Sequence, residues 1–140
     1  METREQTITY SDRVLDEATH PKNMRRMPDP DARGIVHGRC GDTMEIYLRL
    51  DGETIKEATF TTDGHESAIA CGSMLTTLVR GRSMEAAGKI SPEELMEALG
   101  GLPEAKHHCA KLTVNTFLEA IADRRAGERA SGQATEKTEG

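Results

Sequence analysis

Three short stretches carry side chains that can bind a metal or act as nucleophiles. They are C-G-D at residues 40–42, D-G-H-E at 63–66 and H-H-C at 107–109. Each stretch lies where one element of secondary structure should give way to the next, and backbone N–H groups at such places favour a thiolate. Cys109 also has an imidazole beside it, so it is the best candidate for a reactive sulfur. The alternative is that each cysteine is a small buried hydrophobic residue.

The composition excludes several classes of protein. The three cysteines form an odd number spread along the chain, which suits free thiols or metal ligands better than disulfides. The net charge is -6 and the basic residues are dispersed, so we expect no nucleic-acid partner. No apolar run is long enough to span a membrane, and the sequence M-E-T-R-E-Q-T-I lacks the apolar core of a signal peptide. These features predict a soluble cytoplasmic protein without a membrane partner.

The elements that must position these stretches can be read from the apolar pattern. Ser11 should cap a first helix that ends at His20-Pro21. Residues 43–50, T-M-E-I-Y-L-R-L, alternate with the two-residue period of a half-buried strand. Asp51-Gly52 predicts a hairpin turn, after which the chain returns as a strand from Ile55. With a short strand at 34–37, these segments predict a three-stranded antiparallel sheet.

After Gly64 the apolar period becomes helical. Ser67 is the expected N-cap of a helix whose apolar stripe includes Cys71 and which ends at Gly81. Further helices are expected after Ser91 and from about His107 to before Gly127. We therefore predict an α+β fold, with a small three-stranded antiparallel sheet packed against about four to five helices. Residues 1–126 should form one domain, and residues 127–140, which lack a large apolar side chain, a disordered tail.

The chemically active stretches also resemble a known family. C-G-D at 40–42, D-G-x-x-S-A-I-A at 63–70 and L-P-x-x-K-x-H-C at 102–109 are similar to the IscU-type iron–sulfur cluster scaffold proteins, also found as the N-terminal domain of NifU. The resemblance extends from Tyr10 to about Asp123. It implies an iron–sulfur cluster assembly scaffold that is not an enzyme. Such a protein accepts sulfur from a cysteine desulfurase, as a persulfide on Cys109 or Cys40, binds iron, assembles a [2Fe–2S] cluster and transfers it to apo-proteins.

The resemblance implies a set of cluster-binding or metal-binding residues, with one departure from the family. Cys40, Asp42, His108 and Cys109 match the family's residues directly. His65 stands where the family has a cysteine, so it matches by position only. Imidazole binds iron in some clusters and also binds Zn²⁺, so His65 either serves as a ligand or weakens the site.

Cys71 could replace the missing thiol only if the first helical turn unwound. In a helix it lies roughly 6 Å further along the axis, on the apolar stripe. We expect it to be a core residue.

Two other functions remain open at the level of sequence. One is a zinc-binding sulfur-transfer protein, with Zn²⁺ in the cluster-free form. The other is a degenerate relative that regulates a desulfurase by binding it.

The segment L-P-E-A-K at 102–106 resembles the L-P-P-V-K segment with which the family binds an Hsp70-type chaperone. Glu104 and Ala105 replace Pro and Val, which should weaken that contact. The alternative is that 102–106 is only a loop that enters a helix.

Overall fold

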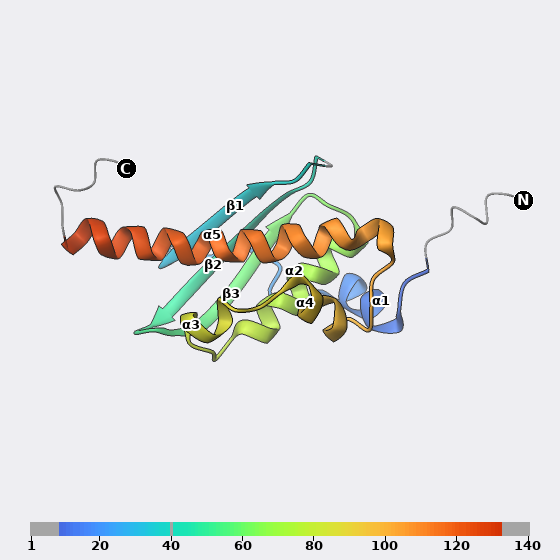
Figure 1. The fold of residues 1–140 in the computed structure, drawn as a ribbon, viewed down its shortest axis with the longest axis horizontal. Helices are drawn as coiled ribbons and strands as arrows, with labels where there is room; N and C mark the ends of the chain where they lie inside the picture. Colours follow the sequence, from blue (N-terminus) through green and yellow to red (C-terminus); the bar gives the residue numbers. More distant parts are fainter. Residues whose placement is uncertain (1–8, 40, 133–140) are drawn as a thin grey trace, which may run out of the picture.

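The structure is a computed structural model that describes residues 9–39 and 41–132. Its three strands are β1 (Ala32–His37), β2 (Thr43–Asp51) and β3 (Thr54–Thr62). They form an antiparallel sheet in the order β1-β2-β3, as the sequence predicted. Two helices, α2 (Glu66–Val79) and α5 (His107–Gly132), pack on the same face of this sheet, α5 against β1 and α2 against β3 (Figure 1). The predicted α+β architecture is therefore confirmed.

The apolar face of β2 forms the centre of the core. Met44, Ile46 and Leu48 are fully buried, as the two-residue period predicted. Tyr47 points to the opposite face and yet is only 3% exposed. Residues 20–31, which precede β1, lie against this face: Arg26 donates a hydrogen bond to the Tyr47 hydroxyl at 3.3 Å, and Arg49 donates to the carbonyl oxygens of Pro28 and Asp29. The outer face of the sheet is thus partly covered by an irregular segment that strand periodicity does not reveal.

Helix caps explain most of the helix boundaries. α1 (Asp12–Thr19) begins after Ser11, whose hydroxyl accepts a hydrogen bond from the Val14 N–H, as predicted. α4 (Pro92–Ala98) begins in the same way after Ser91. The predicted cap of α2 is wrong, because α2 starts at Glu66 with His65 as its N-cap. A short helix that the sequence analysis did not anticipate, α3 (Met84–Ala87), follows α2.

The last part of the chain is one long helix. A 3-10 turn, η2 (Glu104–Lys106), leads into α5 at His107, where the sequence predicted its start. α5 continues to Gly132, so the helix end expected before Gly127 is wrong. The division into a domain at 1–126 and a tail stays a prediction, since residues 133–140 lie outside the described residues. No described helix is both long and apolar enough to cross a membrane.

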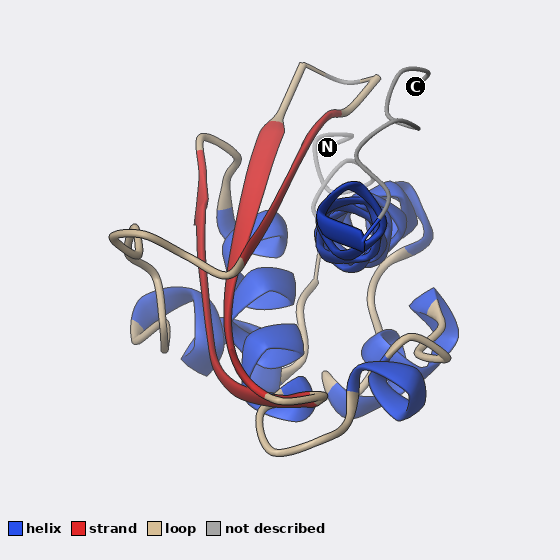
Figure 2. Ribbon diagram, turned by 90° about the vertical axis from the view of Figure 1, so that its left-hand side faces the viewer, coloured by secondary structure: helices blue, strands red, loops and turns tan. Residues whose placement is uncertain are grey.

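α5 approaches β1 so closely that only glycine fits between them. A Cβ added at Gly34 would lie 2.3 Å from the Thr116 carbonyl oxygen and 2.5 Å from the Ala120 backbone nitrogen. Gly34 pairs with Ile46, which pairs with Phe60, so the three residues share the helix-covered face. The backbone contact at Gly34 sets the position of α5 on the sheet. Figure 2 shows α5 almost end-on beside the strands.

Gly34→Ala should lower the free energy of unfolding by about 2 kcal/mol or more, because the added methyl group would push the backbone of α5 away from the sheet. Urea denaturation measures the change. Gly127→Ala is the matched control: Gly127 lies in α5 with no atom within 4 Å of an added Cβ. This control should leave stability unchanged or raise it by up to about 1 kcal/mol. Equal effects of the two variants would contradict the close contact.

Candidate metal centre

The fold brings three potential ligands together, Asp42, His108 and Cys109. One ligand atom from each lies within 4.8 Å of the others. Asp42 ends the turn between β1 and β2, whereas His108 and Cys109 belong to the first turn of α5. Because α5 packs along β1, its first turn arrives at the β1–β2 turn. Sixty-five residues of sequence lie between Asp42 and His108, so only the tertiary structure brings this group together.

The β1–β2 turn is held in shape by its own backbone. The Gly38 N–H donates to the Asp42 carbonyl oxygen at 2.6 Å, and the Gly41 N–H donates to the Gly38 carbonyl oxygen at 3.1 Å. Gly41 has φ of 93°, a conformation that glycine adopts without strain. Cys40, the predicted first cysteine ligand, lies outside the described residues. Its role in the site stays a prediction.

The turn that precedes α2 lies against Asp42. A Cβ added at Gly64 would be 3.0 Å from Oδ2 of Asp42, and Oδ1 of Asp63 accepts a hydrogen bond from the Thr43 N–H at 2.7 Å. The neighbouring His65 is exposed, and its side chain makes no capping hydrogen bond to α2. His65 lies outside the compact group of three ligand atoms. Whether it binds metal stays a prediction, although its turn is beside the group.

Cys109 is the buried sulfur of the group. It is 2% exposed, and its Sγ lies 3.1 Å from Oγ of Ser67 and 3.5 Å from Nε2 of His108. Ser67 is itself buried in the first turn of α2. Sequence reasoning assigned Ser67 to capping, and it missed this contact because no local pattern relates α2 to α5. The only sequence signal was the place of Ser67 within the S-A-I-A segment of the family resemblance.

Cys71 is a core residue, as the apolar stripe predicted. It is fully buried within the hydrophobic core and outside the compact ligand group. Burial raises the pKa of the Cys71 thiol well above its ordinary value, and the nearby Cys109 charge raises it further, against an opposing hydrogen bond with Thr113. The apolar surroundings of Cys71 therefore disfavour its thiolate form, as expected of a core thiol.

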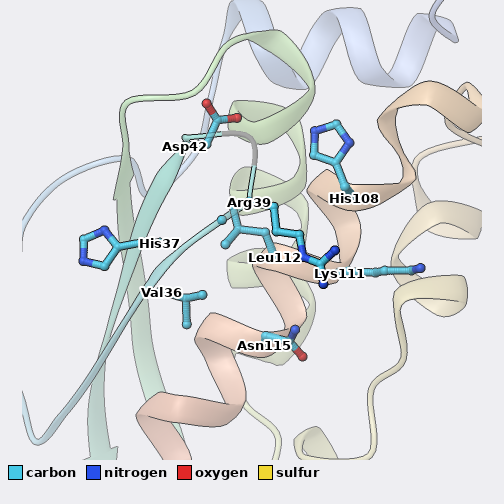
Figure 3. A pocket seen from close by; sticks show the side chains of 9 residues that line it. Val36, His37, Arg39, Asp42, His108, Lys111, Leu112 and Asn115 are labelled. Carbon is cyan, nitrogen blue, oxygen red and sulfur yellow. The ribbon is translucent and has the colours of Figure 1, made fainter.

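The ligand group borders a pocket of about 460 Å³. Asp42 and His108 lie at one end of it and Asn115 at the other, with Arg39 between them (Figure 3). A soft sulfur, an imidazole and a carboxylate beside an open pocket can hold zinc or an iron–sulfide centre and leave a coordination position for another ligand. The fold and the site thus define a small α+β protein with a candidate mixed-ligand metal centre.

The family of this protein follows from comparison with known sequences. The NifU-like N terminal domain matches residues 9–130, and the chain belongs to that family. An Archaeoglobus fulgidus protein named iron–sulfur cluster assembly scaffold protein IscU 1 is 40% identical over 115 residues, which cover 81% of this chain and 75% of the relative. The Haemophilus influenzae protein named iron–sulfur cluster assembly scaffold protein IscU is 36% identical over 124 residues, which cover 85% of this chain and 98% of the relative. The resemblance inferred from the motifs is confirmed.

Solved structures support the same fold. The N-terminal region of a nitrogen-fixing NifU-like protein from Brucella abortus superposes with a TM-score of 0.66 at 19% identity. The match covers 82% of this chain and 93% of that one. At this identity the likeness concerns the fold alone.

The raised pKa of Cys71 predicts a pH dependence of stability. In the unfolded chain this thiol ionises above about pH 8.5, whereas in the folded chain it stays protonated. The unfolded state then binds fewer protons, so the stability due to Cys71 is complete below about pH 8.5 and falls as the pH rises, by up to about 1.4 kcal/mol per pH unit. Urea denaturation of the wild type and Cys71→Ala between pH 7 and 10 isolates this contribution. Parallel pH profiles of the two proteins would contradict it.

The contact between Ser67 and Cys109 predicts a change in thiol reactivity. A hydroxyl donor stabilises a thiolate, so Ser67→Ala should slow the alkylation of Cys109 by iodoacetamide severalfold. Peptide mass spectrometry distinguishes Cys109 from the other cysteines. Ser91→Ala removes a hydroxyl that caps α4 instead, and it should leave Cys109 alkylation unchanged. An unchanged rate in Ser67→Ala would show that the hydroxyl does not act on the sulfur.

Proposed function

We propose that this protein is an iron–sulfur cluster assembly scaffold, for which the cluster is a cargo. The observation that supports this function best is the meeting of Asp42, His108 and Cys109 at the β1–β2 turn. Membership of the NifU-like N-terminal domain family and the names of the IscU relatives support it as well. The scaffold acts in the cytoplasm and builds a [2Fe–2S] cluster.

The proposed ligands divide into strong and displaceable ones. Cys109, with Cys40 by resemblance, supplies thiolate, which iron–sulfide centres prefer. Asp42 supplies a hard oxygen whose bond to iron a thiol of an acceptor protein can displace. His65, by position, supplies imidazole in place of thiolate. This exchange removes one negative charge from the ligand shell and should make the cluster easier to reduce.

Sulfur would arrive from a cysteine desulfurase as a persulfide. The thiolate of Cys109 or Cys40 attacks the outer sulfur of the desulfurase persulfide, a new S–S bond forms, the old one breaks, and the desulfurase cysteine leaves as a thiolate. Iron binding beside this sulfur and an external reductant then lead to the cluster. Acceptor apo-proteins take the finished cluster, and the scaffold is a carrier without turnover of its own.

A chaperone of the Hsp70 type is a further proposed partner, at residues 102–106. Glu104 and Ala105 are exposed within η2, so a partner can reach them. His107 fixes the segment through a contact of 3.0 Å between its Nε2 and the Leu102 carbonyl oxygen. The charge of Glu104 would weaken an apolar contact.

Zinc binding is the second candidate function. A thiolate, an imidazole and a carboxylate match the ligands of tetrahedral Zn²⁺, and a bound zinc would place Cys109 to take sulfur from a desulfurase. A third possibility is a regulator that binds the desulfurase without metal. The metal content of the protein decides between these functions.

Anaerobic purification followed by reconstitution with iron and sulfide tests the proposal. The wild type should be red-brown, with visible absorption bands and equal amounts of iron and acid-labile sulfide. Cys109→Ala should lose stable cluster binding, because the centre loses one of few soft ligands. Cys71→Ala is the matched control, since it removes a thiol outside the ligand group, and its cluster content should equal that of the wild type.

Other results would contradict the scaffold. A colourless protein with stoichiometric zinc would support the sulfur-transfer protein, and a metal-free protein that still binds a desulfurase would support the regulator. Full cluster content in Cys109→Ala would remove Cys109 from the site.

A further inference from the structure

Two cationic side chains of the pocket beside the metal ligands have no partner in the described part of the chain. Arg39 comes from the β1–β2 turn and Lys111 from the first turns of α5. No ion pair or hydrogen bond joins either side chain to residues 9–39 or 41–132. By contrast, Arg25 and Arg33 form ion pairs with glutamates at 2.5 and 3.0 Å. The pocket therefore presents positive charge that the described protein groups leave uncompensated.

This arrangement is unexpected in an acidic protein. The chain has 24 acidic and 18 basic residues, so carboxylates to pair with a lysine or arginine are abundant. The only carboxylate among the residues that line the pocket is Asp42, which belongs to the metal ligand group. A metal or cluster bound there would engage that charge. Arg39 and Lys111 would then be the main charges facing the pocket.

The other walls of the pocket indicate the kind of anion that fits. Val36 and Leu112 offer apolar surface, and Asn115 offers an amide that both donates and accepts hydrogen bonds. Arg39 extends from its turn toward α5 in Figure 3, at the level of Lys111. A volume of about 460 Å³ is ample for a small organic molecule.

We propose that this pocket binds a small organic carboxylate beside Asp42, His108 and Cys109. The guanidinium of Arg39 matches a carboxylate through two parallel N–H groups, and Lys111 adds a second positive charge. Val36 and Leu112 contact the carbon part of the ligand, which distinguishes it from inorganic phosphate. The role of such a ligand, to bring a group to the metal centre, rests on the proposed function. The binding of the carboxylate itself does not.

Two sources of carboxylate fit this chemistry. One is a thiol-bearing amino acid such as cysteine, whose sulfur would bind the metal after its proton passes to solvent. The other is a polycarboxylate such as citrate, which would arrive with iron already chelated. Both would place their carboxylate at Arg39 and Lys111, and the experiment distinguishes them.

Isothermal titration of the metal-free protein, freed of chelator by gel filtration, tests the proposal in Tris chloride with dithiothreitol. The probes are citrate, L-cysteine, cysteamine and inorganic phosphate. At least one carboxylate should bind saturably, and its affinity should fall about tenfold or more in the double variant Arg39→Gln, Lys111→Gln. Lys89→Gln removes an exposed charge outside the pocket and should bind as the wild type does.

The comparison between probes identifies the source of the carboxylate. Binding of cysteine but not of cysteamine, which lacks the carboxylate, would assign the thiol ligand, and binding of citrate would assign the polycarboxylate. The proposal is overturned if neither carboxylate binds, if the double variant binds as well as the wild type, or if phosphate binds as tightly as the better carboxylate.

Cluster reconstitution, measured separately, keeps the two proposals apart. A wild type that assembles a cluster without binding a carboxylate retains the scaffold function and loses this inference. A wild type that binds a carboxylate without assembling a cluster supports this inference and contradicts the scaffold function.

Discussion

The backbone contact between α5 and β1 determines the rest of the structure. At Gly34 the sheet and the helix are so close that a methyl group would lie 2.3 Å from a carbonyl oxygen. This contact aligns α5 along the edge strand, so its first turn reaches the β1–β2 turn. His108 and Cys109 thereby meet Asp42, and Lys111 lines the pocket that begins there. A larger residue at position 34 would shift the helix and separate the ligands.

The surroundings of the two described cysteines decide their chemistry. Cys71 lies among apolar side chains that oppose its ionisation, and burial raises its pKa. Cys109 is almost as buried, yet it lies within reach of the Ser67 hydroxyl and the His108 ring, both of which can donate to a thiolate. Burial alone therefore does not distinguish a core thiol such as Cys71 from a candidate ligand such as Cys109. The polar groups around the sulfur do.

The proposed role of His65 as a ligand requires no change of fold. It occupies the N-cap of α2, and an N-cap residue needs only an extended backbone, which both histidine and cysteine adopt. The proposed consequence is a ligand shell with less negative charge, next to a pocket whose unpaired charges are positive. A small carboxylate entering that pocket would restore negative charge near the metal. The scaffold proposal and the carboxylate proposal are thus consistent in their electrostatics, and an experiment can contradict either one without the other.

The sequence by itself determined the elements whose causes are local. Strand alternation in 43–50, the Ser11 and Ser91 caps and the apolar stripe with Cys71 depend on neighbours within a few residues, and the structure has them all. Family motifs also identified Asp42, His108 and Cys109 as candidate ligands before any geometry was known. Only the tertiary structure decided the burial of Tyr47, the Ser67–Cys109 contact and the pocket between Arg39 and Lys111. These depend on how α5 and an irregular segment pack on the sheet, because contacts between residues distant in sequence leave no periodic pattern in the chain.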